Sequence, residues 1–115
     1  MSKREKQQPQ ASQVLAVDGL RLNLTTKELQ NGHGFIHLTP KECQLLATFM
    51  RYPNQVLSHR FLMREVWETD YIGDMRTLQV HVSWLRRKIE ANPRRPIRLR
   101  TVRGVGYRFG AQLAS

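Results

Sequence analysis

The stretch TLQVHVSWLRRKIE, residues Thr77–Glu90, places apolar side chains on two sides of one predicted helix. At about 100° per residue, four of them form a narrow stripe, the spacing typical of a helix that packs on a core. These four are Leu78, Val82, Leu85 and Ile89. Val80 and Trp84 fall roughly opposite that stripe, among polar and basic neighbours. Burial explains the first stripe, so the second needs another partner.

Two further helices are predicted upstream. Thr39 is a suitable N-cap, the proline after it suits the first helical position, and Glu42 completes a capping box. This helix should end at about Tyr52, because the next residue is proline. The second helix should begin after Ser58 as N-cap and run through Trp67.

Strand patterns flank the helices. Residues 14–38 are predicted to form a small antiparallel meander, because leucines alternate with polar residues from Leu20 to Leu24 and turn signals lie at 18–19 and 31–32. After Asn92-Pro93 ends the third helix, a strand pattern through Ile97 and Leu99 leads to a glycine turn and a second strand. The second strand contains Tyr107 and Phe109. The predicted order is a small sheet, three helices and a hairpin.

Positive charge is concentrated in the last third of the chain. Lysine and arginine number 19 against nine acidic residues, a formal net charge of +10. Ten of these cations lie between Arg76 and the C-terminus, where Glu90 is the one acid, so that segment carries +9. Such a field favours nucleic acid, anionic membranes or acidic proteins as partners.

Several classes of protein are disfavoured. No apolar run approaches the roughly 20 residues of a membrane span, and no signal-peptide core follows the polar N-terminus. The single cysteine, Cys43, excludes an intramolecular disulfide framework and is expected in the core. We therefore expect a soluble, cytoplasmic protein without a membrane partner.

Catalytic and cofactor-binding motifs are not found in the sequence. There is no Walker loop, paired-cysteine metal site or HExxH motif, and Gly104-Val105-Gly106 lacks the third glycine of a dinucleotide fingerprint. His33 and His37 share one strand face but have no third ligand. We expect no enzymatic activity, no cofactor and no metal site.

Three helices followed by a basic hairpin are the plan of a winged helix-turn-helix, an α+β fold. In that fold the last helix enters the major groove of DNA, and the hairpin reaches the neighbouring backbone or the minor groove. Cations on the helix and hairpin would neutralise phosphates; they are Arg76, Arg86, Arg87, Lys88, Arg98, Arg100, Arg103 and Arg108. The alternatives are a solvated charged face, an RNA-binding protein and a module that binds an acidic protein.

Groove binding gives the second apolar stripe a role. Thymine methyl groups lie in the major groove, so Val80 and Trp84 can contact them. Gln79 and Ser83 can hydrogen-bond base edges or phosphates, and Arg87 can clamp the backbone. In the alternative interpretation, Trp84 packs against the hairpin or the second helix.

Three segments resemble the OmpR/PhoB-type DNA-binding domain of two-component response regulators. They are LTPKECQLLATFM at 38–50, RTLQVHVSWLRRKIE at 76–90 and RTVRGVGYRF at 100–109, and the resemblance covers about residues 14–110. The resemblance implies a four-stranded antiparallel N-terminal sheet, three helices and a C-terminal hairpin wing. It also implies transcriptional regulation by head-to-tail dimers on direct-repeat sites, controlled by a receiver domain.

The same resemblance assigns roles to single residues. Arg76, Thr77, His81 and Arg86 match positions that contact phosphates, and Thr101 and Arg103 match wing positions, the arginine reaching the minor groove. Members of the family carry two arginines where this chain has Ser83 and Trp84. An indole donates a single N–H and cannot bind guanine in the bidentate way of arginine, so we expect less dependence on guanine at that step.

An acidic loop separates the second and third predicted helices. By resemblance it is the loop that contacts RNA polymerase, with Glu68, Asp70, Tyr71 and Ile72 as its contact residues. Two other roles are open: repulsion that keeps the loop off phosphates, or capping of the third helix by Asp74.

The expected domain organisation is simple. Residues 1–13 read as a disordered tail or interdomain linker, residues 14–110 as the winged-helix domain and residues 111–115 as a C-terminal tail. The first segment is too short for a receiver domain, so the chain is either an output domain separated from its receiver or a stand-alone one. Its likeness to an interdomain linker favours the first, with a receiver domain in the full-length protein. The isolated domain is expected to be monomeric until adjacent half-sites bring two copies together.

Overall fold

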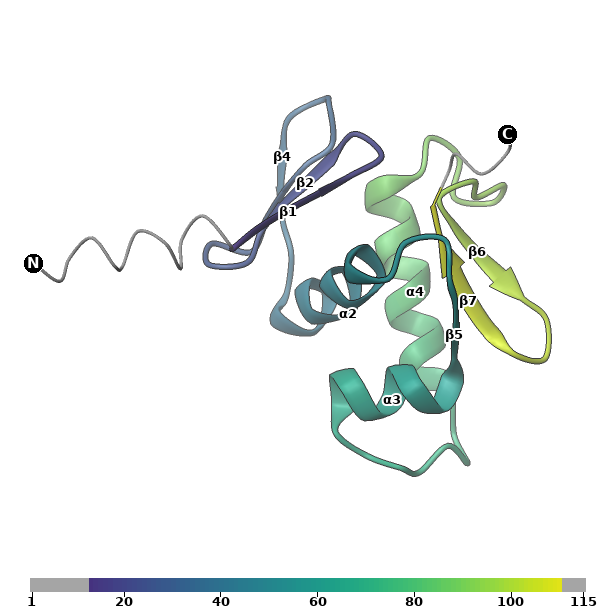
Figure 1. Ribbon diagram of the computed structural model, residues 1–115. Helices are drawn as coiled ribbons and strands as arrows, with labels where there is room; N and C mark the ends of the chain where they lie inside the picture. Colours follow the sequence, from purple (N-terminus) through teal and green to yellow (C-terminus); the bar gives the residue numbers. More distant parts are fainter. Residues whose placement is uncertain (1–12, 111–115) are drawn as a thin grey trace, which may run out of the picture.

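A computed structural model describes residues 13–110, in which three helices lie between two antiparallel sheets (Figure 1). Apart from Gln13, the predicted tails at 1–13 and 111–115 lie outside these residues. The elements are β1 (Val14–Val17), β2 (Leu20–Asn23), β3 (Glu28–Gln30), β4 (Phe35–His37), α2 (Pro40–Arg51), β5 (Val56–Ser58), α3 (His59–Trp67), α4 (Arg76–Ile89), β6 (Leu99–Val102) and β7 (Gly106–Phe109).

The N-terminal sheet is the predicted meander, in the order β1-β2-β3-β4. Asp18 and Gly19 join the first two strands with φ angles of 52° and 81°, the left-handed pair that a tight hairpin turn requires. Leu22 lies opposite Leu29 in the strand register, and both are fully buried. The sheet thus presents one apolar face to the helices.

Helix capping follows the sequence prediction. Glu42 donates its backbone N–H to Thr39 Oγ1 at 3.2 Å, and Thr39 donates its own to Glu42 Oε1 at 2.9 Å, so the capping box of α2 is confirmed. Ser58 Oγ accepts the N–H of Phe61 at 3.1 Å and caps α3, also as predicted. These caps satisfy N–H groups that a helix start leaves without intrahelical partners.

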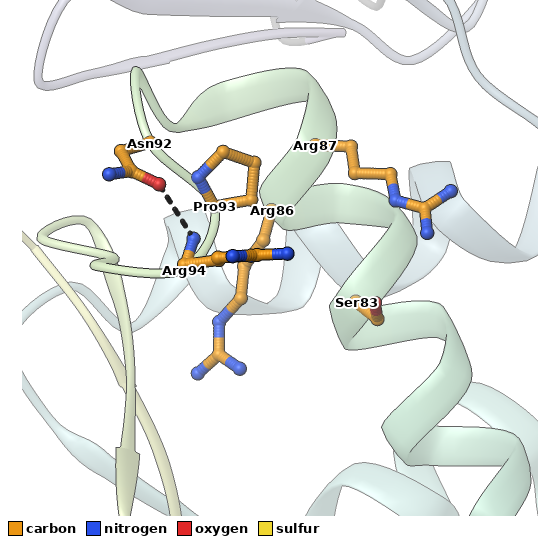
Figure 2. A pocket seen from close by; sticks show the side chains of 6 residues that line it. All are labelled: Ser83, Arg86, Arg87, Asn92, Pro93 and Arg94. Carbon is orange, nitrogen blue, oxygen red and sulfur yellow. Dashed lines mark hydrogen bonds between the residues drawn. The ribbon is translucent and has the colours of Figure 1, made fainter.

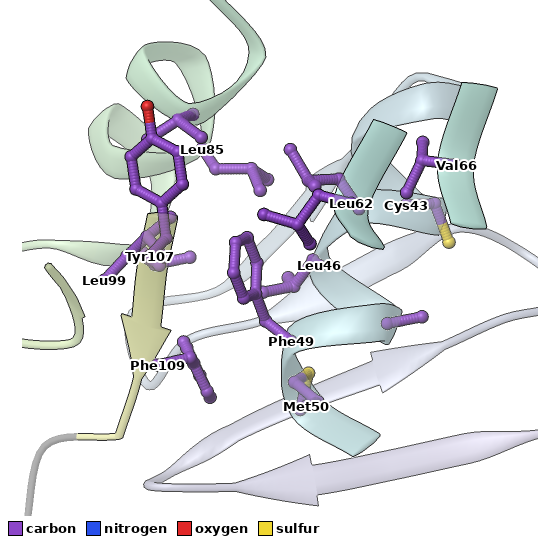
Figure 3. Close-up of a cluster of buried hydrophobic side chains, with 14 of the residues drawn as sticks. Cys43, Leu46, Phe49, Met50, Leu62, Val66, Leu85, Leu99, Tyr107 and Phe109 are labelled. Atoms are coloured by element: carbon purple, nitrogen blue, oxygen red, sulfur yellow. The ribbon is translucent and has the colours of Figure 1, made fainter. Parts of the chain in front are cut away.

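The apolar stripe of α4 is buried throughout, as its spacing predicts. Leu85 faces the cluster around Phe49 of α2, whose ring centroid lies 6.4 Å from those of both Tyr107 and Phe109 (Figure 3). Cys43 is buried in the same core. The hairpin is therefore fastened to the helices by aromatic packing, which fixes its position beside α4.

The C-terminal sheet differs from the prediction in two ways. It has three strands, in the order β5-β7-β6, because the short segment Val56–Ser58 pairs with β7. In addition, β6 begins at Leu99 and Ile97 lies outside it, half exposed. The reason is Glu90, whose buried carboxylate accepts the backbone N–H groups of residues 97–99 at 2.8–3.1 Å.

The described part of the chain contains no helix long and apolar enough to cross a membrane.

Candidate nucleic-acid interface

One face of α4 is exposed along its whole length. Its exposed residues are Arg76, Thr77, Gln79, Val80, Ser83, Trp84 and Arg87. Val80 and Trp84 are 40% and 41% exposed, so the second apolar stripe faces solvent instead of a second core. Seven of the nine predicted helix contacts therefore share one accessible surface.

Trp84 is held in place by a row of rings. Its ring centroid lies 4.9 Å from that of His81, which lies 5.0 Å from Trp67 of α3. The two ring contacts connect Trp84 to the second helix through His81. This packing limits the motion of Trp84 while leaving part of the indole exposed.

The His81 ring is oriented by the helix itself. Its Nδ1 lies 2.8 Å from the carbonyl oxygen of Thr77, which can only accept, so Nδ1 carries a proton. A phosphate contact by Nε2 therefore requires the doubly protonated, cationic ring.

The N-terminal end of α4 carries an exposed ion pair. Asp74 Oδ2 lies 2.8 Å from Nη2 of Arg76, and Asp74 Oδ1 accepts the backbone N–H of Arg76 at 3.0 Å. The hydrogen bond from the Arg76 side chain has the largest effect on the pKa of Asp74, and that from the Arg76 backbone the next largest. Together they lower this pKa to about 2. The N-cap itself is Met75, so the proposed capping by Asp74 is one residue out of place, although its carboxylate still satisfies one N–H of the first turn.

Arg86 connects α4 to the hairpin. Its Nε donates to the carbonyl of Leu99 and its Nη2 donates to Thr101 Oγ1, both at 2.9 Å. Burial lowers the pKa of this guanidinium below its usual value. The residue thus fixes the angle between the helix and the strand that carries Thr101.

The hairpin presents the predicted wing residues to solvent. Arg100, Thr101 and Arg103 are all exposed. Arg103 lies in the turn closed by the hydrogen bond from Val105 N–H to Val102 O at 2.9 Å. Helix face and wing are adjacent, joined through Arg86.

Two of the cations that the sequence predicted to neutralise phosphates instead bind groups within the fold. Lys88 Nζ lies 2.7 Å from buried Glu42 of α2. Arg98 donates to the carbonyls of Ile89 and Asp18, at 2.6 and 3.1 Å. The prediction that every cation of this segment neutralises phosphates is therefore wrong for this pair, because charge alone does not reveal which side chains turn inward.

One exposed cation beside α4 was not predicted from the sequence as a DNA contact. Arg94, in the loop after the helix, lines a pocket with Ser83 and Arg87 (Figure 2). Its sequence signal was weak, since loop arginines are common. The turn made by Asn92 and Pro93 is a detectable cue, because it reverses the chain toward the helix.

The loop between α3 and α4 exposes the predicted tip. Glu68 ends α3 in the left-handed conformation, with φ of 52°, and Asp70 accepts from Arg64 Nε at 3.0 Å. Tyr71 is 66% exposed and Ile72 is 37% exposed. An aromatic and an aliphatic side chain therefore project from a loop that lies beside the start of α4.

Metal ligation finds no support in residues 13–110, where no group of three His, Cys, Asp or Glu side chains is arranged to hold an ion. His33 and His37 are both exposed.

Three helices, a hairpin packed on them and a cationic helix face define a winged-helix DNA-binding protein. The chain matches the family described as "Transcriptional regulatory protein, C terminal" over residues 32–109. It belongs to this OmpR/PhoB-type family of DNA-binding output domains of two-component response regulators.

Curated relatives support the same assignment. The chain is 43% identical over 109 residues to the alkaline phosphatase synthesis transcriptional regulatory protein SphR of Synechococcus elongatus, covering 94% of this chain and 42% of that protein. It is 51% identical over 96 residues to the sensory transduction protein RegX3 of Mycobacterium tuberculosis, covering 84% and 42%. The chain thus spans about four tenths of these relatives.

Solved structures share the fold. The DNA-binding domain of CpxR from E. coli superposes with a TM-score of 0.72 at 31% identity, over 85% of this chain and 97% of that one. The RstA DNA-binding domain of Klebsiella pneumoniae, solved in complex with the RstA box, gives 0.77 at 23% identity over 86% and 98%, a likeness of fold alone.

Proposed function

We propose that this domain binds duplex DNA sequence-selectively, with α4 in the major groove and the β6–β7 turn at the minor groove. The observation that carries the proposal is that one face of α4 is exposed from Arg76 to Arg87, as is Arg103 in the wing. Arg86 holds the two parts at a fixed angle, so both can meet one face of a duplex.

Different side chains on this surface have different tasks. The proposed phosphate contacts on α4 are Arg76, Thr77, His81 and Arg86, with Arg87 as a further clamp on the backbone. The proposed DNA contacts of the wing are Arg100, Thr101 and Arg103. Gln79 and Ser83, both exposed, are proposed to hydrogen-bond base edges or phosphates. Val80 and Trp84 are proposed to read thymine methyl groups, since an indole cannot make the bidentate contact of arginine with guanine.

The test is selection from a randomised duplex pool at two salt concentrations, for the natural chain and Trp84→Ala. We expect a direct repeat about one helical turn apart, with a thymine preference that the variant loses and binding that weakens steeply with salt. Enrichment of a guanine at that step would contradict the assigned role of Trp84. Equal affinity for single-stranded RNA in competition would contradict duplex recognition.

The polymerase contact is a separate part of the proposal. Glu68, Asp70, Tyr71 and Ile72 form an exposed loop that carries two apolar side chains, as a protein contact requires. Alanine substitutions in this loop should lower transcription activation while leaving DNA affinity unchanged. An equal loss of both would argue against a separate contact.

The regulatory context follows from the family. We propose that a receiver domain in the full-length protein controls this domain, that copies bind head to tail on direct repeats, and that the protein works in the cytoplasm.

A further inference from the structure

The loop after α4 turns back toward the exposed face of that helix and forms a pocket with it. The pocket is lined by Ser83, Arg86 and Arg87 of α4 and by Asn92, Pro93 and Arg94 of the loop (Figure 2). Half of the lining side chains are arginines and none is acidic. We propose that this pocket binds one phosphate of the duplex backbone, an inference that rests on the proposed binding mode of α4.

The chain builds the pocket through one tight turn. Asn92 Oδ1 accepts the backbone N–H of Arg94 at 3.0 Å, and the Asn92 carbonyl accepts that of Arg95 at 2.9 Å. The turn directs the Arg94 side chain toward α4 (Figure 2). Ser83 is small, so the helix leaves room for an anion at this point.

Two guanidinium groups in the pocket are available to a ligand. Arg86 already donates through Nε to Leu99 and through Nη2 to Thr101, so it forms part of the wall and has less of its guanidinium to offer a phosphate. In contrast, the side chains of Arg87 and Arg94 make no hydrogen bond or ion pair within residues 13–110. Neither side chain has an acidic partner among residues 13–110, so a bound anion would supply the missing negative charge. Phosphate oxygens match the planar fork of arginine.

The position of the pocket on α4 favours a backbone phosphate over other anions. The 14-residue helix is about 21 Å long, whereas the major groove is about 12 Å wide. In the proposed binding mode the base contacts come from residues between Gln79 and Trp84, so the last turn of α4, which ends at Ile89, reaches the rim of the groove. Ser83 and Arg87 lie one helical turn apart on the exposed face, and the pocket therefore meets the phosphate chain where α4 leaves the groove.

The experiment compares Arg94→Ala with Arg95→Ala, an adjacent exposed arginine outside the pocket. Duplex affinity is measured over a range of salt concentrations, with Arg76→Ala as a reference for the proposed binding mode. Loss of one phosphate contact should make the slope of log affinity against log salt shallower by about 0.9, and should weaken binding equally for different sequences. Because the Arg94 side chain is exposed, the variant should keep the melting temperature of the natural chain.

A second readout locates the contact. Ethylation of one particular phosphate should weaken binding of the natural chain. Ethylation of the same phosphate should not weaken binding of Arg94→Ala. It should still weaken binding of Arg95→Ala.

The outcomes separate the two proposals. An unchanged slope in Arg94→Ala, with a shallower slope in Arg76→Ala, overturns the pocket and leaves the binding mode of α4 standing. Equal effects of Arg94→Ala and Arg95→Ala also overturn the pocket, because general electrostatics then explains both. If neither Arg94→Ala nor Arg76→Ala changes the slope, both proposals fail.

Discussion

Some side chains of α4 stabilise the fold, and others are proposed to contact DNA. Arg87 is exposed, whereas the next residue, Lys88, is bonded to a carboxylate in the core. Adjacent helical residues point about 100° apart, so one step along the chain separates a proposed DNA contact from an internal ion pair. The two roles are therefore separable by mutation.

Replacing Lys88 with alanine should lower the free energy of unfolding by about 3 kcal/mol, because it leaves the buried Glu42 carboxylate without its cation. The matched control is Arg87→Ala, which should change stability by less than about 0.5 kcal/mol but weaken DNA binding. Urea denaturation of both variants measures the difference. Equal stabilities of the two variants would show that the ion pair contributes little.

The same ion pair should make stability depend on pH. Burial raises the pKa of Glu42, but hydrogen bonds from Lys88 and Thr39 outweigh it, so the net pKa lies below its usual value. A carboxyl whose folded pKa is depressed contributes stability above its unfolded pKa, about 4.3, and loses it as the pH falls below that value. Denaturation of the natural chain and Glu42→Gln between pH 7 and pH 3 should show the two curves converging in acid.

Cys43 should react slowly with thiol reagents. The side chain is 4% exposed, and burial raises the pKa of its thiol, so little thiolate is available near neutral pH. We expect labelling at pH 8 to accelerate strongly in denaturant. Rapid labelling of the folded chain would show that the core opens locally at α2.

At the scale of the elements, the wing depends on a close approach of two strands. A Cβ on Gly106 would lie 1.9 Å from the carbonyl oxygen of Leu57, so β7 can pair with β5 only if this residue has no side chain. Gly104, in the turn of the same hairpin, faces open space but has a φ of +76°. Gly106 is needed for the close packing of β7 on β5, and Gly104 is needed for the backbone conformation of the turn.

Gly106→Ala should therefore be more destabilising than Gly104→Ala. We expect a loss of more than about 2 kcal/mol for the first, from displacement of a backbone that packs on the core, and about 1 kcal/mol for the second. Thermal unfolding of both variants measures the losses. A larger effect at Gly104 would show that the turn, and not the pairing with β5, limits hairpin stability.

At the scale of the whole molecule, the C-terminal end of α4 ties the two sheets together. The carbonyl of Lys88 accepts from the Asn31 side chain at 3.3 Å, and Arg98 donates to the carbonyl of Asp18 between β1 and β2. The Glu90 carboxylate holds the chain that enters β6. These contacts place α4, the wing and the N-terminal sheet in one fixed arrangement.

This arrangement leads to a prediction about assembly. The net charge is +10, and most of it lies in the last third of the sequence. This charge makes free copies repel each other, so we expect a monomer in sedimentation experiments. DNA phosphates neutralise that charge, and a duplex with two direct repeats should bind two copies where a single half-site binds one. A stable dimer without DNA would contradict this expectation.

The order of the elements other than β5 can be predicted from the sequence, because helix caps, apolar spacing and turn residues are local signals. The capping box at Thr39, the cap at Ser58 and the buried stripe of α4 all lie where predicted. The local pattern also placed Val80 and Trp84 roughly opposite the buried stripe but left open whether Trp84 packs inside; in the structure they are 40% and 41% exposed.

The tertiary structure decided which polar and charged side chains are available to a partner. Strand β5 is too short to leave a pattern, and it exists because β7 lies beside it. Lys88 and Arg98 are engaged inside the fold, and Arg94 reaches the face of α4, although all three look alike as cations in a sequence. The physical reason is that hydrogen bonds between residues far apart in the chain depend on packing, which no local spacing encodes.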